Sequence, residues 1–253
     1  MTKPSAPHLR ARFDPQGPAE QAGLARRGLS WVICALLGLA ASAATAQSAE
    51  PPPAVSAGLA EAVRLYGSGE RHAAGQAFER LARSGSTAAH YNLAVMHLRG
   101  EVVGARPEVA RRHMLAAALG GFVSAQVALA QMDETGTGGP LDRAASQRWY
   151  ERAAEAGSVE AQVAAATNHY LGRGTPVDRA AAVRWYERAA MAGEVGAQYL
   201  LASMYETGDG VATDLDAARR WYEAAARNGD PAAPLKLRSL AGGGAPTGPT
   251  GRP

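Results

Sequence analysis

Cysteine is nearly absent from this sequence of 253 residues, since the one cysteine is Cys34. Cys34 lies inside an uncharged stretch, residues 29–46, and it does not follow a lipobox because Ile33 stands where a small residue is needed. If that stretch is removed on export, the mature chain has no thiol. Disulfides, thiolate catalysis and cysteine metal sites are then excluded together, and stability must come from packing alone.

Aromatic residues are also scarce, at 6% of the sequence, whereas hydrophobic residues make up 47%. That hydrophobic share is enough to bury a substantial core, which argues against global disorder. Most of the apolar residues are alanine and leucine, which are strong helix formers. The composition therefore favours helices packed closely through small side chains over a β-rich fold.

The sequence lacks an excess of charge once its N-terminal part is set aside. Residues 1–46 hold five of the 26 basic residues and two of the 23 acidic ones, which leaves 21 of each sign from residue 47 onward. The net charge of +3 therefore belongs to the N-terminal segment. Residues 47–253 are therefore neutral overall and contain no motif that recognises DNA or RNA, so we expect no nucleic-acid partner.

Residues 29–46 have the character of an export signal. Arg26 and Arg27 precede the apolar part, and residues 44–46 (Ala-Thr-Ala) form a small-residue cleavage pattern, so we expect cleavage after Ala46 and a periplasmic or secreted product. If the segment is retained, it becomes a single-pass inner-membrane anchor with the rest of the chain facing the periplasm. The prolines in residues 47–54 predict an extended linker.

A period of 36 residues organises the rest of the chain. The motif Trp-Tyr-Glu-Arg or Trp-Tyr-Glu-Ala begins at Trp149, Trp185 and Trp221, which are 36 residues apart. Glycines suited to end a helix recur at the same interval, at Gly85, Gly121, Gly157, Gly193 and Gly229. A fixed period in this range is typical of a solenoid of stacked helical hairpins.

Each unit is predicted to contain a first helix that begins with Ala-Gln, a glycine-rich loop, and a second helix that carries the Trp-Tyr motif. Asp142, Asp178 and Asp214 precede the second helices, where they would act as N-caps. The predicted solenoid spans residues 55–240, with units at about 55–85, 86–121, 122–157, 158–193 and 194–229 and a terminal cap at 230–240. Residues 241–253 read as a disordered tail.

The repeated pattern, read from residue 197 to 229, is Ala-Gln-x-x-Leu-Ala-x-Met-Tyr-x-x-Gly-x-Gly-Val-x-x-Asp-x-x-x-Ala-x-x-Trp-Tyr-Glu-x-Ala-Ala-x-x-Gly. It resembles the Sel-one-like repeat (SLR), a relative of the tetratricopeptide repeat. The early units depart from it, because His113 and Met114 stand in place of Trp-Tyr. The resemblance implies an all-α fold, a right-handed α/α superhelix of helix-turn-helix repeats that acts as an adaptor or scaffold. Bacterial members are often exported.

Three sets of residues invite a functional interpretation. The tryptophans Trp149, Trp185 and Trp221 could stack on a ligand, but an aromatic residue at one phase of every repeat is more typical of packing between hairpins. The Gly-x-Gly loops at 136–138, 172–174 and 208–210 imitate a phosphate loop without its strand. Four histidines suggest metal binding, but His90 and His97 lie about two helical turns apart. That set is His90, His97, His113 and His169.

The expected binding surface is the concave face, lined by the Ala-Gln helices. Its varying positions are His90, Asn92, Gln126, Gln162 and Gln198, although the recurrence of glutamine favours hydrogen bonds between repeats. Neighbouring pairs such as Glu151-Arg152 and Glu187-Arg188 are expected to be ordinary surface charges.

The sequence predicts an exported scaffold or adaptor that mediates protein–protein interactions in the bacterial cell envelope and is not an enzyme. We name no catalytic, cofactor-binding or metal residue and expect no cofactor; the partner is a protein or peptide on the concave surface. One alternative is a cell-wall or β-lactam hydrolase, as linked to cysteine-rich SLR proteins. Another is a membrane-tethered assembly or signalling factor, which requires residues 29–46 to stay in place.

Overall fold

The computed structural model describes residues 53–242, and that part of the chain is built of eleven α-helices without a strand. The helices are α3 (Pro53–Gly67), α4 (Arg71–Arg83), α5 (Thr87–Arg99), α6 (Pro107–Leu119), α7 (Val123–Thr135), α8 (Arg143–Glu155), α9 (Val159–Leu171), α10 (Arg179–Met191), α11 (Val195–Thr207), α12 (Leu215–Arg227) and α13 (Ala233–Gly242). The prediction of an all-α fold is confirmed.

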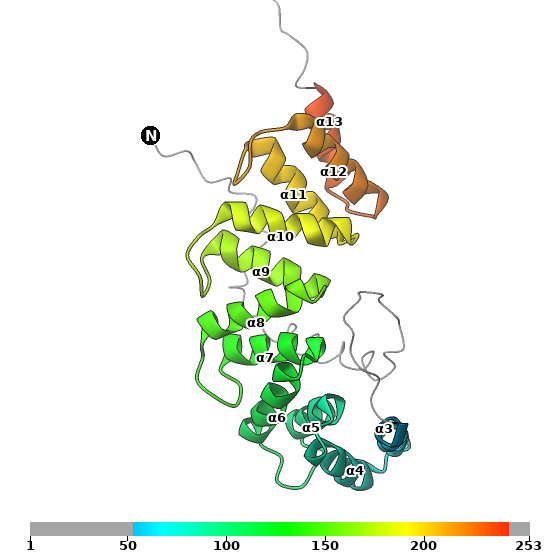
Figure 1. Ribbon diagram of the computed structural model, residues 1–253. Helices are drawn as coiled ribbons and strands as arrows, with labels where there is room; N and C mark the ends of the chain where they lie inside the picture. The colour runs from blue at the N-terminus through cyan, green and yellow to red at the C-terminus, as the bar shows by residue number, and fades with distance from the viewer. Residues whose placement is uncertain (1–52, 243–253) are drawn as a thin grey trace, which may run out of the picture. The chain divides into compact units, whose positions relative to one another are not determined.

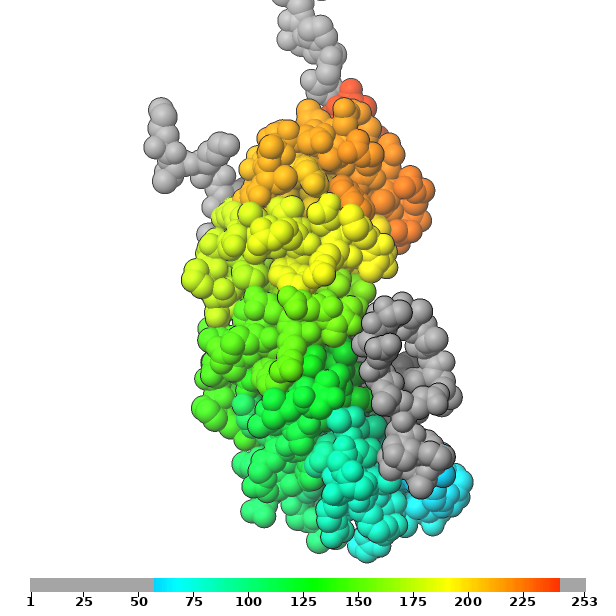
Figure 2. Space-filling view, in the orientation of Figure 1, coloured from blue at the N-terminus to red at the C-terminus, as the bar shows by residue number. Residues whose placement is uncertain are grey.

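The helices form hairpins that stack in chain order (Figure 1). Each helix packs mainly on the helix before it and the helix after it, from α3 through α13. The loops that join the two helices of a unit (α7 to α8, α9 to α10 and α11 to α12) all lie along one side of the stack in Figure 1. Figure 2 shows the successive units lying directly on one another. This is the predicted α/α solenoid.

The second helices begin where the sequence predicts N-caps. Asp142, Asp178 and Asp214 each accept a hydrogen bond from a backbone N–H three residues further on, at 2.8 Å. Such a cap satisfies one of the free N–H groups in the first turn and is worth about 1 kcal/mol. The three caps therefore fix the start of α8, α10 and α12 at the same phase of the repeat.

The second glycine of each Gly-x-Gly loop lets the loop pack on the preceding unit. Gly174 has a φ of +71°, and a Cβ there would lie 2.1 Å from the backbone oxygen of Arg143, at the start of α8. Gly138 and Gly210 approach Pro107 and Arg179 in the same way. The spacing that imitates a phosphate loop is therefore a packing requirement between units.

Alanine is the most frequent residue of the core, which also contains tyrosine, leucine and methionine. Tyr150, Tyr186 and Tyr222, which directly follow the three repeated tryptophans, are exposed by only 5%, 2% and 0%. The alanines three residues after these tyrosines are fully buried, so neighbouring helices approach closely; they are Ala153, Ala189 and Ala225.

Both ends of the solenoid differ from the sequence-based boundaries. Helix α3 begins at Pro53, two residues inside the expected linker, because proline is tolerated in the first turn of a helix. Helix α13 runs to Gly242, two residues into the expected tail. Its start is fixed by Asp230, which accepts from the N–H groups of Ala232 and Ala233 at 2.8 and 2.9 Å.

The expected export segment, residues 1–46, lies outside the described residues, as do most of the linker and most of the tail. Within residues 53–242, no helix is both long enough and apolar enough to cross a membrane.

Candidate functional site

The three repeated tryptophans are half-buried, with one part of each ring packed on the core. Trp149 contacts two successive clusters of buried side chains, one formed by α5 to α7 and one by α7 to α9. Trp185 packs on the second of these clusters, and Trp221 packs on the last one. The predicted packing role is confirmed, yet each ring also keeps an exposed part at the surface.

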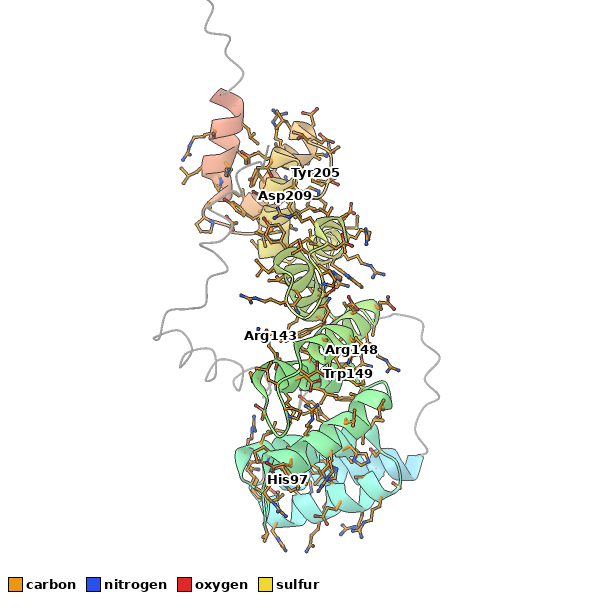
Figure 3. The ribbon with its side chains drawn as sticks, turned by 90° about the vertical axis from the view of Figure 1, so that its left-hand side faces the viewer. His97, Arg143, Arg148, Trp149, Tyr205 and Asp209 are labelled. Atoms are coloured by element: carbon orange, nitrogen blue, oxygen red, sulfur yellow. The ribbon has the colours of Figure 1, made fainter. Side chains whose placement is uncertain are left out.

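An exposed arginine directly precedes each tryptophan, and the same is true of His113, which occupies the tryptophan position of its unit. Among residues 53–242, these four arginines make no hydrogen bond and no ion pair. Figure 3 shows one such pair, Arg148 and Trp149, side by side on α8. We call the eight residues the Arg–Trp face: Arg112, His113, Arg148, Trp149, Arg184, Trp185, Arg220 and Trp221.

Two open pockets lie on this face at equivalent positions of two units. The C-terminal pocket lies among α10, α11 and α12, with Glu187, Tyr205 and Trp221 in its wall. The N-terminal pocket lies among α4, α5 and α6 and is lined by Glu79, His97 and His113. Each of these residues precedes its counterpart by 108 positions, or three periods of 36. The repeat therefore places part of the lining of the two pockets at equivalent positions.

The two units between the pockets carry buried ionic or polar contacts at the same phase. In one, Asp133 is fully buried and forms an ion pair with Arg111 of α6. In the other, His169 Nε2 lies 2.8 Å from Glu151 Oε1, which also accepts from Gln147. This position of the repeat is occupied by four different residues in turn: His97, Asp133, His169 and Tyr205. Figure 3 shows the first and the last of them, His97 and Tyr205, at two levels of the stack, with Trp149 of α8 between them.

Glu151 was expected to be an ordinary surface charge, and that expectation is wrong. Its side chain is only 36% exposed and bridges α8 and α9 through Gln147 and His169. The adjacent Arg152 is exposed, and its guanidinium lies 5.6 Å from the centre of the Trp149 ring. Arg188 lies over Trp185 in the same way, at 4.8 Å. Arg152 and Arg188 thus each make a cation–π contact with the tryptophan of their own helix.

The structure brings three of the four histidines together. His90 Nδ1 and His113 Nδ1 lie 3.0 Å apart, and the His97 ring stacks on His113 with 5.8 Å between centroids. Burial lowers the pKa of His90 and of His97. The pKa of His113 is lowered by burial and further by the two neighbouring rings. Distance along one helix could not reveal the cluster, since His113 comes from the next helix.

Residues 53–242 contain no group of three or more histidine, cysteine, aspartate or glutamate side chains arranged to hold a metal ion. His169 lies in another unit, where Glu151 is its partner.

The glutamines of the Ala-Gln helices are buried, so the expectation that they line a binding surface is wrong. Gln126, Gln162 and Gln198 are exposed by 3%, 7% and 4%. The side-chain amide of each donates to a backbone oxygen at the end of the preceding helix, at 3.1–3.2 Å. The expected hydrogen bonding between repeats is therefore confirmed. His90, at the same phase one unit earlier, does line the N-terminal pocket, while Asn92 donates to Ala88 of its own helix.

The fold and the recurrent face define an α-helical repeat protein whose units cannot bury their apolar faces alone. The model of the Sel1 repeat family matches residues 87–122, 123–158, 159–194 and 195–230, which together make up more than half of the chain. The chain belongs to the Sel1 repeat family, the SLR family that its sequence resembles. Proteins of this family generally mediate protein–protein interactions as non-catalytic scaffolds.

Two solved structures illustrate the likeness. A protective antigen of uropathogenic Escherichia coli with an SLR fold is 26% identical, with a TM-score of 0.68 over 77% of this chain and 43% of the antigen. A Sel1 repeat protein from Oxalobacter formigenes is 34% identical, with a TM-score of 0.60 over 67% of this chain and 49% of that protein. The chain thus spans less than half the length of either relative. No curated protein matches the chain.

Proposed function

We propose that this protein is a non-catalytic scaffold that binds another protein along the Arg–Trp face. The observation that carries the proposal is the recurrence of that face, with an unpaired exposed arginine and a half-exposed aromatic ring at every 36 residues. Arginine and tryptophan are the side chains most often found at the energetic centre of protein interfaces. The tryptophans are held in place by the core, so they lose little freedom on binding.

The binding surface in this proposal is contributed mainly by the second helices. The C-terminal pocket receives most of its lining from α12, one residue from α10 and one from α11. The glutamines of the first helices are occupied within the core. A partner that follows the stack would therefore contact successive second helices.

We also propose that the scaffold works in the bacterial cell envelope. The support is the sequence of residues 1–46, with its uncharged stretch and the Ala-Thr-Ala pattern before residue 47. N-terminal sequencing of the mature protein separates the two forms. A start at Gln47 indicates a periplasmic or secreted protein, and an intact segment indicates an inner-membrane anchor.

A crosslinking pull-down from envelope extracts tests the scaffold function. The bait is the full chain, compared with a variant in which the three half-buried tryptophan rings are removed, Trp149→Ala, Trp185→Ala and Trp221→Ala. A control variant, Leu141→Ala with Val177→Ala, removes exposed apolar side chains from the loops, which are 56% and 58% exposed. We expect the bait and the control to capture the same protein and the tryptophan variant to lose it. No specific capture by the bait with several crosslinkers contradicts the proposal.

A further inference from the structure

We infer that the Arg–Trp face binds an extended acidic segment of its partner and sets one arginine against one carboxylate in each unit. This inference rests on the proposed scaffold function and specifies the partner's chemistry. It starts from the distribution of charge, which differs between the two kinds of helix even though residues 47–253 as a whole are neutral.

Among the helices in the middle of the solenoid, from α7 to α12, only the second helices contain lysine or arginine, and one further arginine, Arg173, lies in a loop. α8, α10 and α12 each carry three arginines against one or two acids. α7, α9 and α11 contain no lysine and no arginine. The stack thus presents a positive stripe along its second helices, beside first helices that are neutral or acidic.

The arginines of the face are free to bind, whereas two of the acids near them, Glu151 and Asp214, are already engaged within the fold. Arg148 and Arg184 are exposed and have no partner in the described part of the chain. Glu151 accepts from Gln147 and His169, and Asp214 serves as an N-cap. A guanidinium offers a planar fork of donors that fits a carboxylate with two parallel hydrogen bonds.

The acids that remain on the face favour a peptide with spaced charges over a nucleic acid. Glu187 and Glu223 follow Arg184 and Arg220 by about one helical turn, so each of these two helices carries a glutamate beside the arginine of the face. A phosphate backbone carries a charge at every nucleotide and would meet these glutamates at close range. A polypeptide can place its carboxylates at the arginines and neutral residues between them.

The spacing of the arginines suits an extended chain. Packed helices lie roughly 8–10 Å apart, so second helices of neighbouring units are separated by roughly 10–20 Å. An extended chain covers about 3.3–3.6 Å per residue, which gives one acidic residue in about every three to six. Across four units the face would hold a segment on the order of 10–18 residues.

Fluorescence anisotropy with synthetic peptides tests the inference. The probe is a 16-residue Gly/Ser peptide with glutamate at every fourth position. Two comparison probes are used: the same peptide with lysine at those positions, and a single-stranded DNA of 16 nucleotides. The full chain is compared with a face variant, Arg112→Gln, Arg148→Gln, Arg184→Gln and Arg220→Gln. A matched control removes four exposed arginines that lie outside α8, α10 and α12, Arg64→Gln, Arg80→Gln, Arg106→Gln and Arg238→Gln.

Of the three probes, we expect only the glutamate peptide to bind, and its affinity should fall as the salt concentration is raised. Each exposed arginine–carboxylate pair should contribute about twofold to fivefold, so the face variant should bind at least about tenfold more weakly while the control changes little. The reversed variant, Arg148→Glu, Arg184→Glu and Arg220→Glu, should gain binding to the lysine peptide. Equal losses in face variant and control, or DNA binding as tight as peptide binding, overturn the inference.

The outcome can be separated from failure of the scaffold function. If the arginine face variant still captures the envelope partner and the tryptophan variant does not, the scaffold function stands and the acidic segment is refuted. If neither the full chain nor any variant captures a partner, the scaffold function itself fails.

Discussion

The Nδ1 atoms of His90 on α5 and His113 on α6 lie 3.0 Å apart, and neither histidine follows the pattern of the later units. His90 stands 36 residues before Gln126, and His113 stands 36 before Trp149. The unit of residues 86–121 thus carries two titratable rings where the next unit carries a neutral glutamine and a tryptophan. His97 stacks on His113, and Glu79, Arg106 and Arg112 are the charged groups that act on the cluster.

The histidine cluster should make the fold acid-sensitive. Burial lowers the pKa of all three histidines below the ordinary value near 6.5, so the unfolded chain binds more protons than the folded chain once the pH falls below about 6.5. The free energy of unfolding should therefore decrease as the pH is lowered from 7.5, until the histidines of the folded protein also become protonated. Urea midpoints at pH 7.5 and 5.0 measure this.

The matched variant for that prediction restores the repeat pattern, His90→Gln with His113→Trp. It should lose less stability between the two pH values than the parent protein. His72→Gln, at an exposed histidine, is the control and should keep the parent's pH dependence. An unchanged pH dependence in the double variant would show that the cluster is not responsible.

Removing one member of the buried Arg111–Asp133 pair should be strongly destabilising. Asp133 is fully buried and Arg111 is 26% exposed, so Arg111→Val leaves an uncompensated carboxylate inside the fold. We expect a loss of about 3–5 kcal/mol in the free energy of unfolding. Adding Asp133→Tyr recreates the Val183 and Tyr205 pair found 72 residues later, and should recover most of the loss. Denaturant unfolding of both variants provides the measurement, and no recovery would contradict the equivalence of the units.

Two glycines separate the cost of a positive φ from the cost of a close approach. Gly174 and Gly193 both have a left-handed backbone, at φ +71° and +89°, but only Gly174 has a backbone atom within reach of a Cβ. Gly193→Ala should cost about 1 kcal/mol, because only backbone strain is added. Gly174→Ala should cost more, by roughly 1–3 kcal/mol, because the loop must also move away from Arg143. Equal losses of thermal stability would show that the loop does not need this contact.

Much of the fold could be predicted because the same residue types recur at the same positions of several units. The interval between Trp149, Trp185 and Trp221 gave the unit length, and the aspartates and glycines at fixed phase gave the helix ends. The depth of each side chain was harder to predict. α11 is buried nearly all round, from Ala197 to Met204, so periodicity could not tell which side of a first helix faces solvent.

The functional face was less predictable. The row Arg112, Arg148, Arg184 and Arg220 is visible in the sequence as a 36-residue pattern, but only the structure shows that these arginines are exposed and have no acid partner. The contact of His90 with His113 depends on two helices meeting, and spacing along one helix cannot show it. The export segment and its cleavage remain predictions from residues 1–46.

Site-specific photo-crosslinking tests the central claim most directly. Met191 is 70% exposed and shares its phase with Arg83 and Arg227, which line the two pockets, so a benzophenone side chain there lies beside the face without removing an arginine or a tryptophan. Val177, 58% exposed on a loop of the same unit, is the control position. We predict that the full chain in cells forms a discrete crosslinked species with a partner protein from position 191 and not from position 177. A partner crosslink from position 177 alone would contradict the assignment of the Arg–Trp face.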